Sequence, residues 1–212
     1  GDRALSHGEL VAKVEAAAAD LIARGVVPGD RVGLCAANSA DHVVAYLTIL
    51  RAGAVWTPLN PRNGARLNSL FQQRAGLKLT LHDAASAEAM GETVQPLSLD
   101  DWCPTSVDPA TLPEISDDPE RPFALKFTGG STGVPKGVLQ SVRSGAAALR
   151  SLHRFYDFNA DDVNLAVAPL THGASHYILP VLAAGGAHVL LDKPEREAIL
   201  GELTTRITTV FM

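Results

Sequence analysis

Short runs rich in apolar and β-branched residues alternate along the chain with longer segments whose apolar residues recur every three or four positions. The short runs predict β-strands and the longer segments predict amphipathic helices. In the N-terminal part of the chain, strands are predicted at 31–36, 54–60 and 77–81, and helices begin near residues 9, 40 and 65. A strand, a helix and a second strand joined by tight turns form a βαβ unit, so we expect these strands to be parallel.

Capping residues define the ends of the predicted helices. Ser6 and Glu9 have the spacing of a capping box, in which each side chain bonds the backbone N–H of the other residue. Asn38 or Ser39 can cap the second helix, and Gly53 lies where that helix should end. The strands and helices therefore have clear boundaries, and the pattern predicts an α/β fold with parallel-rich sheets flanked by helices.

The same alternation returns in the C-terminal part of the chain. Strands are predicted at 123–127, 163–167, 187–191 and 207–212. We expect Phe123, Leu125 and Phe127 to lie on one face of the first of these strands. Ser144 is the expected cap of the helix that follows.

A change of composition separates the two parts. Six of the thirteen prolines fall between residues 91 and 122, among clustered acidic residues, which predicts a surface connection with little regular structure. We therefore expect a first α/β layer at 1–90, a proline-rich connection at 91–121, and a second α/β layer at 122–212.

A glycine- and hydroxyl-rich segment follows the predicted strand 123–127. It reads Thr128-Gly129-Gly130-Ser131-Thr132-Gly133-Val134-Pro135-Lys136-Gly137. Glycine lets backbone N–H groups approach a ligand, and successive N–H groups in a turn form a concave anion site. The three hydroxyl groups add hydrogen-bond donors, and Lys136 adds a positive charge. This chemistry suits the phosphates of a nucleotide.

The segment differs from the common P-loop, which ends in Gly-Lys-Ser/Thr and leads into a helix. Here Pro135 precedes Lys136 and Gly137 follows it, so we expect the lysine in an extended or turning segment. The alternative is a glycine-rich surface turn with an incidental lysine. The length of the string from Phe127 to Gly137 favours the phosphate site.

The string resembles the phosphate-binding loop of the AMP-forming acyl-adenylate enzymes, which include acyl-CoA synthetases, luciferases and the adenylation domains of peptide synthetases. The usual pattern in that family is Thr-Ser-Gly-Ser/Thr-Thr-Gly-x-Pro-Lys-Gly, and this chain departs from it at Gly129, where serine is commonest. The resemblance implies that Lys136 and Thr132 act in catalysis. It also implies that the residues binding ATP are Thr128, Gly129, Gly130, Ser131, Thr132, Gly133 and Lys136.

A second motif, Pro169-Leu170-Thr171-His172-Gly173, resembles the family's Pro-Leu-x-His element, which lies between a strand and a helix and lines the carboxylate pocket. The resemblance implies that His172, Gly173 and Ala174 bind the substrate. Taken alone, His172 has another reading, a structural histidine at a helix start. We expect it to position the acyl group and not to transfer a proton, because a carboxylate is already ionised at neutral pH.

The implied activity is that of an AMP-forming acid–thiol ligase. Such an enzyme joins a small carboxylic acid to AMP at the expense of ATP and then passes the acyl group to coenzyme A, as in fatty acid metabolism. The residues show no metal-ligand spacing, so we predict no metal site in the protein, and Mg²⁺ would arrive with ATP.

Two alternatives stay open. One is the adenylation domain of a peptide synthetase, although such domains usually carry Phe-Asp where this chain has Thr171-His172. The other is an α/β module without catalysis that acts as a binding or homodimerising fragment. The resemblance covers only the front part of the family's usual length, so we expect a truncated chain that is inactive alone and binds ATP weakly.

Composition excludes several other classes. The formal net charge of −5 argues against nucleic acid or an anionic membrane as the main partner. No apolar run has the length of a membrane span. Cys35 and Cys103 are too few for a disulfide framework, which predicts a cytoplasmic protein.

Overall fold

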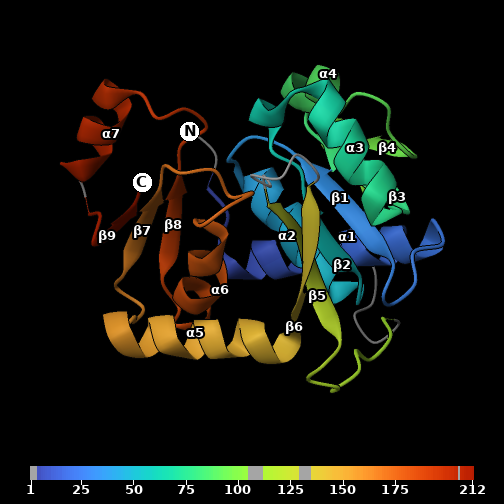
Figure 1. Ribbon diagram of the computed structural model, residues 1–212. Helices are drawn as coiled ribbons and strands as arrows, with labels where there is room; N and C mark the ends of the chain where they lie inside the picture. Colours follow the sequence, from blue (N-terminus) through green and yellow to red (C-terminus); the bar gives the residue numbers. More distant parts are fainter. Residues whose placement is uncertain (1–3, 105–111, 129–134, 205) are drawn as a thin grey trace.

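The computed structural model describes residues 4–104, 112–128, 135–204 and 206–212. Its strands form a six-stranded sheet in the order β4-β3-β1-β2-β5-β6 and a three-stranded sheet in the order β8-β7-β9. Helices flank both sheets (Figure 1). Every described strand pair is parallel except β5 with β6. The predicted fold class, α/β with parallel-rich sheets, is confirmed.

The larger sheet is built from residues of both the N-terminal and the C-terminal part of the chain. Its strands are β1 (Arg31–Cys35), β2 (Val55–Pro58), β3 (Leu79–His82), β4 (Pro96–Ser98), β5 (Pro122–Thr128) and β6 (Lys136–Ser141). The accompanying helices are α1 (His7–Ala23), α2 (Ala40–Arg51), α3 (Ala65–Ala75) and α4 (Ala87–Met90). The predicted capping box begins α1, where Ser6 Oγ accepts from Glu9 N–H and Glu9 Oε2 accepts from Ser6 N–H.

The smaller sheet lies entirely in the C-terminal part of the chain. Its strands are β7 (Val163–Ala166), β8 (Ala187–Leu190) and β9 (Thr209–Phe211), and the helices around it are α5 (Val142–Tyr156), α6 (Ser175–Ala183) and α7 (Arg196–Leu203). In Figure 1, α5 runs below the smaller sheet as far as β6, and α6 lies between the two sheets. The cap of α5 is Ser141 and not the expected Ser144, because the helix starts directly after β6 without a turn. Ser141 Oγ accepts from Ser144 N–H at 3.3 Å.

The sheets divide the chain at a different point from the expected layers. We expected residues from 122 onward to form a second layer, but β5 and β6 extend the first sheet, where Trp56 of β2 pairs with Ala124 of β5. The proline-rich connection also contributes β4, which pairs with β3. A change of composition marks a surface connection, but it does not reveal to which sheet the chain returns. The proposed segment boundaries themselves stay a prediction.

A bulge in β5 changes which side chains share a face. The pairing of β5 with β6 shifts between Pro122 and Ala124. Leu125 and Phe127 pack on the face covered by α3, where Phe127 stacks on Phe71 with ring centroids 4.5 Å apart. Phe123 packs instead against the core on the other face. The expectation that Phe123, Leu125 and Phe127 share one face is therefore wrong, because a bulge breaks the two-residue repeat.

Asn38 joins the two sheets. It follows β1, and its side-chain amide donates to the carbonyl of Ala168 at 2.9 Å, while its Oδ1 accepts from the backbone N–H of Leu170 at 2.8 Å. Asn38 is buried, as is Leu170 in the shared core. Since Ala168 and Leu170 follow β7, these bonds hold the carboxyl ends of β1 and β7 together.

Candidate functional site

The described ends of the predicted phosphate loop are the facing ends of β5 and β6 in one hairpin. Thr128 is the last residue of β5 and Lys136 the first of β6, and the two are paired across the hairpin. Thr128 Oγ1 donates to the carbonyl of Lys136 at 3.4 Å. Predictions for the intervening Gly129, Gly130, Ser131, Thr132 and Gly133 lie outside the described residues and stay predictions.

Lys136 is exposed and extended, as its neighbours Pro135 and Gly137 suggested. Its ammonium group makes no ion pair with any residue of the described ranges. Gly137 has a packing reason for its small size: a Cβ there would lie 2.9 Å from Leu125 Cδ1. The hairpin thus fixes the backbone on both sides of the loop and leaves the charge of Lys136 available to a ligand.

The second predicted motif follows β7 and leads into α6. His172 is exposed, and its carbonyl accepts from Ser175 Oγ at 2.6 Å. Gly173 packs under Phe211, whose Cζ would lie 2.7 Å from an added Cβ. Ala174 is fully buried in the core. Of the three predicted substrate-binding residues, His172 alone presents a side chain to solvent, and the substrate contacts of all three stay a prediction.

Both motifs lie at the same edge of the joined sheets. Thr128 ends β5 at the edge where β1 also ends, since the two strands run parallel within one sheet. Asn38 then connects the end of β1 to the segment after β7 that carries His172. Ligand sites of α/β folds lie outside the carboxyl ends of the strands. The structure therefore brings the predicted phosphate loop and His172 to one such edge.

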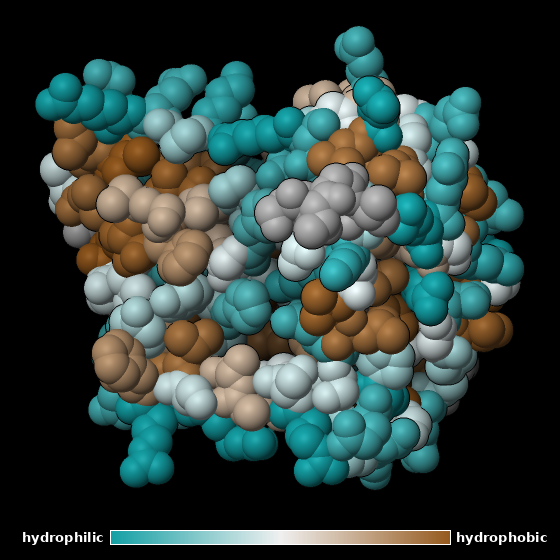
Figure 2. Space-filling view, in the orientation of Figure 1, coloured by the Kyte–Doolittle hydropathy of each residue, from teal (hydrophilic) through white to brown (hydrophobic). Residues whose placement is uncertain are grey.

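A cavity of about 280 Å³ lies beside these motifs, between β5, β6, α2, α5 and α6. Figure 2 shows a hollow with hydrophobic residues at its bottom, just above the position that α5 occupies in Figure 1. Its walls are largely apolar, and the larger apolar side chains are Leu50, Trp56, Phe123, Leu149, Leu179 and Pro180. None of the three predicted substrate-binding residues lines it, but Ser175 and His176, which directly follow them, do.

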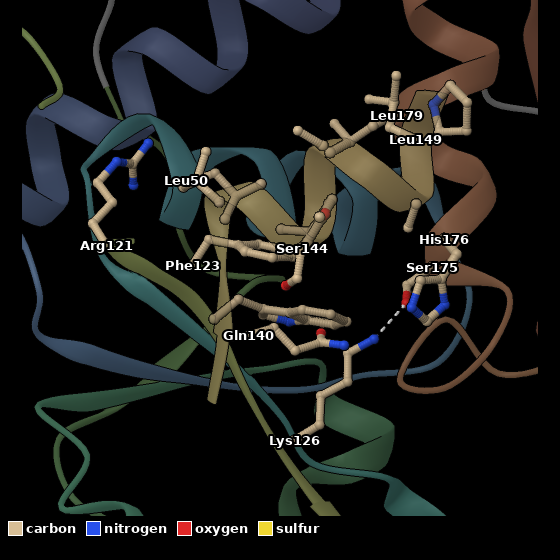
Figure 3. A pocket seen from close by; sticks show the side chains of 17 residues that line it. Leu50, Arg121, Phe123, Lys126, Gln140, Ser144, Leu149, Ser175, His176 and Leu179 are labelled. Atoms are coloured by element: carbon tan, nitrogen blue, oxygen red, sulfur yellow. Dashed lines mark hydrogen bonds between the residues drawn. The ribbon is translucent and has the colours of Figure 1, made fainter. Parts of the chain in front are cut away.

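Lys126 projects from β5 into this cavity (Figure 3). Its Nζ donates to Ser175 Oγ at 3.3 Å and lies 5.0 Å from the centre of the Trp56 ring. Burial lowers the pKa of Lys126 to about 8. The pKa of His176 is lowered as well, mainly by burial and further by the charge of Lys126.

Sequence analysis missed Lys126, Gln140 and Asn38. Lys126 left a signal, a lone charge within an apolar strand, but only the structure shows that its face borders a cavity. Gln140 stands on β6 with nothing in the sequence to mark it, and the side-chain Oε1 is buried without a hydrogen-bond partner among the described residues. Asn38 was considered as a helix cap, whereas Ser39 has that role, accepting from His42 N–H at 3.0 Å.

Comparison with known proteins identifies the family. The family model described as AMP-binding enzyme matches residues 1–212. The chain belongs to the AMP-binding enzyme family. This confirms the resemblance read from the glycine-rich segment.

Relatives come from two branches of adenylate-forming enzymes. Nonribosomal peptide synthetase 8 of Aspergillus fumigatus is 33% identical over 210 residues, which are 97% of this chain and 2% of the synthetase. ATP-bound MatB of Rhodopseudomonas palustris is 28% identical with a TM-score of 0.80, covering 96% of this chain and 43% of MatB. The fold also matches o-succinylbenzoate coenzyme A synthetase of Bacillus subtilis in complex with AMP, at 22% identity and a TM-score of 0.84, covering 99% of this chain and 56% of that one.

The chain therefore spans about half of the solved relatives, and a far smaller share of the synthetase. The described residues contain no group of three or more His, Cys, Asp or Glu able to hold a metal ion. No helix in the same ranges is both long and apolar enough to cross a membrane.

Proposed function

We propose that the chain is the N-terminal part of an ATP-dependent, AMP-forming acyl-CoA ligase. The observation that carries the proposal is the meeting of two motifs at one sheet edge: the hairpin with the free ammonium of Lys136 and the segment with exposed His172. ATP binding is supported by this hairpin, whose described ends, Thr128 and Lys136, are exposed and fit a polyphosphate. MatB, a relative of similar fold, has been solved with ATP bound.

In the proposed first step, an oxygen of the substrate carboxylate attacks the α-phosphorus of ATP. The bond from that phosphorus to the β-phosphate oxygen breaks, which gives an acyl-adenylate and pyrophosphate. Lys136, Thr132 and the backbone N–H groups of the loop would stabilise the negative charge on the phosphates. Mg²⁺ would be bound through phosphate oxygens and add to this stabilisation. The thiol of coenzyme A then attacks the acyl carbon, its proton passes to solvent, and AMP leaves.

The described parts of this chain provide the phosphate side of the site and one wall of the acid side. The relatives are about twice as long or longer, so the activity of the whole protein is proposed from a part of it. We expect the chain alone to lack turnover and to bind Mg-ATP weakly, which isothermal titration measures. Micromolar affinity together with turnover would contradict this expectation.

The second candidate is the adenylation domain of a peptide synthetase, which the 33% identity to nonribosomal peptide synthetase 8 favours. Such a domain activates an amino acid, whose ammonium group needs an acidic partner. Where peptide-synthetase adenylation domains usually carry Phe-Asp, this chain has Thr171-His172. Among the described residues lining the cavity the charged groups are those of Arg121 and Lys126, and none is aspartate or glutamate. This charge supports an acid without an amino group as substrate.

The decisive experiment measures acid-dependent exchange of pyrophosphate into ATP by the complete gene product. A panel of short, fatty, aromatic and amino acids is tested, and coenzyme A is then added to detect the thioester. We expect exchange with acids that lack an amino group, followed by acyl-CoA. Exchange with amino acids and no thioester with coenzyme A would favour the peptide-synthetase candidate. No exchange with any acid, despite a folded protein, would favour the module without catalysis.

A further inference from the structure

The cavity between the two sheets contains hydrogen-bonding groups that the protein leaves without partners. Trp56 is buried, and its indole N–H has no acceptor among the described residues. The side-chain Oε1 of Gln140, in the same lining, is also buried without a partner. Since the oxygen and nitrogen of an amide are told apart only by their partners, Gln140 can equally present its N–H₂ to the cavity. Buried polar groups are normally bonded, so these two are available to bond a ligand that enters the cavity.

Lys126 adds a positive charge without a counter-ion. Its ammonium contacts the hydroxyl of Ser175 and the ring face of Trp56, and no carboxylate of the described residues forms an ion pair with it. Arg121 stands at the other end of the cavity in Figure 3. A largely buried ammonium is stabilised by a hydrogen-bonded anion, which the described residues do not supply here. An apolar cavity with an ammonium group at one side suits an acid with an apolar body.

The position of Lys126 separates this anion site from the reaction centre. Lys126 and Thr128 lie two residues apart on β5, about 7 Å along the strand, and the Lys126 side chain turns away toward Ser175. Ser175 in turn donates to the carbonyl of His172. This spacing lets a substrate hold one carboxylate near the phosphate loop and a second acidic group at Lys126.

We propose that the enzyme selects acids with an apolar body and a second anionic group, and that Lys126 is the specificity-determining cation that pairs with this group. Gln140 and the indole N–H of Trp56 supply further donors to the same anion. The inference rests on the proposed function, because it assumes that the other carboxylate is the one activated. It names the class of substrate, which the motifs alone do not.

The first test compares matched acids in the pyrophosphate-exchange assay with the complete gene product. Hexanedioate, octanedioate and decanedioate are each compared with the monoacid of the same chain length. We expect higher kcat/KM for the diacids, and a fall of this diacid-to-monoacid ratio by about tenfold or more in Lys126→Met. Lys13→Met, at an exposed position of α1, is the control and should leave the ratio unchanged. A ratio that changes by less than about twofold in Lys126→Met would overturn the inference.

The second test needs no adenylation and uses the chain itself. In a Trp102→Phe background, Trp56 is the remaining tryptophan, and its fluorescence reports on ligands that enter beside Lys126. Octanedioate and octanoate should change the signal, whereas octanamide should not, and Lys126→Met should weaken the binding of both anions by about tenfold. Equal binding of octanamide, or no loss in Lys126→Met, would overturn the site. Binding that depends on Lys126 in a protein without exchange activity would instead refute the proposed function and leave the anion site standing.

Discussion

Lys136 and Lys126 stand on the two paired strands of one hairpin, yet their surroundings are opposite. Lys136 is exposed at the first position of β6, where water solvates its charge. Lys126 is largely buried against Trp56 and Ser175, and burial lowers its pKa to about 8. An exposed lysine costs the fold almost nothing, whereas a buried one destabilises it unless a partner compensates. The first is therefore recognised by its motif, and the second by its energetic cost.

The same contrast predicts different consequences for catalysis. We assign Lys136 to the phosphates, which every substrate shares, and Lys126 to the far end of the acid, which only some substrates possess. Loss of Lys136 should slow all acids alike, and loss of Lys126 should change the choice among them. The following predictions test this division, from the largest expected effect to the smallest.

Replacing Lys136 with alanine should lower the exchange rate with every acid by about 10²–10³, or about 3–4 kcal/mol in transition-state stabilisation. The free energy of unfolding should stay the same, since Lys136 is exposed and forms no ion pair within the described residues. Exchange kinetics and urea denaturation measure the two quantities, with Lys13→Ala as control. An unchanged rate would remove Lys136 from the phosphate site, and an effect confined to diacids would reverse the two assignments.

Replacing Lys126 with methionine should stabilise the protein by up to about 3 kcal/mol at pH 7. The pKa of this lysine is about 8 in the folded chain, against a model-compound value of 10.5. Between these values the unfolded chain binds the proton and the folded chain does not, so the free energy of unfolding of the wild type rises with pH from about 8 to 10.5. Below about pH 8 the destabilisation is fully present. Methionine abolishes this dependence.

Urea denaturation at pH 7 and at pH 9.5 checks the direction of this pH dependence. The difference in the free energy of unfolding between wild type and Lys126→Met should narrow as the pH rises. Octanedioate should also narrow it at pH 7, by stabilising only the wild type. A variant less stable than the wild type at both pH values would show that Lys126 already has a stabilising partner in the folded chain, which contradicts the cavity described here.

Replacing Asn38 with alanine should destabilise the protein by about 2 kcal/mol and raise the KM for acids while leaving the KM for ATP unchanged. The variant leaves the N–H of Leu170 and the carbonyl of Ala168 buried without their partner. These bonds hold the segment that carries His172, but they do not touch the β5–β6 hairpin. Ser39→Ala is the matched control, since losing this helix cap costs about 1 kcal/mol and should leave the KM for acids unchanged. Equal changes in both KM values would show that Asn38 supports the whole edge and not the acid side alone.

Local patterns predicted much of the fold. The capping box at Ser6 and Glu9, the βαβ order of β1, α2 and β2, and the extended conformation at Lys136 all depend on neighbours in sequence, and each agrees with the structure. The family motif likewise depends on consecutive residues. What could not be predicted involves partners distant in sequence. The return of β5 to the edge of β2 is one example, and the bulge that turns Phe123 is another.

The candidate site also has one part that neighbouring residues in the sequence predict and another part that depends on residues distant in the sequence. The proposed phosphate loop could be read from the sequence because its chemistry is concentrated in one string of glycines, hydroxyls and a lysine. The cavity draws its walls from β2, β5, β6, α2, α5 and α6, so no single stretch of sequence contains it. Ala174 shows the limit of spacing, because a residue two positions from His172 is fully buried in the core. Spacing identifies neighbours along the chain, but burial decides which of them meet a ligand.

The smallest expected effect concerns the hydroxyl that links the cavity to the His172 segment. Ser175→Ala removes the acceptor of Lys126 and the donor to the carbonyl of His172, which should lower the free energy of unfolding by about 1 kcal/mol. The diacid-to-monoacid ratio should change by no more than about threefold, because a substrate anion, and not this hydroxyl, is the main partner of the ammonium. Urea denaturation and the exchange assay measure both, with Ser175→Thr expected to retain the hydrogen bonds. A tenfold fall of the ratio in Ser175→Ala, restored in Ser175→Thr, would mean that Ser175 orients the Lys126 side chain. Substrate selection in the cavity would then depend on the His172 segment.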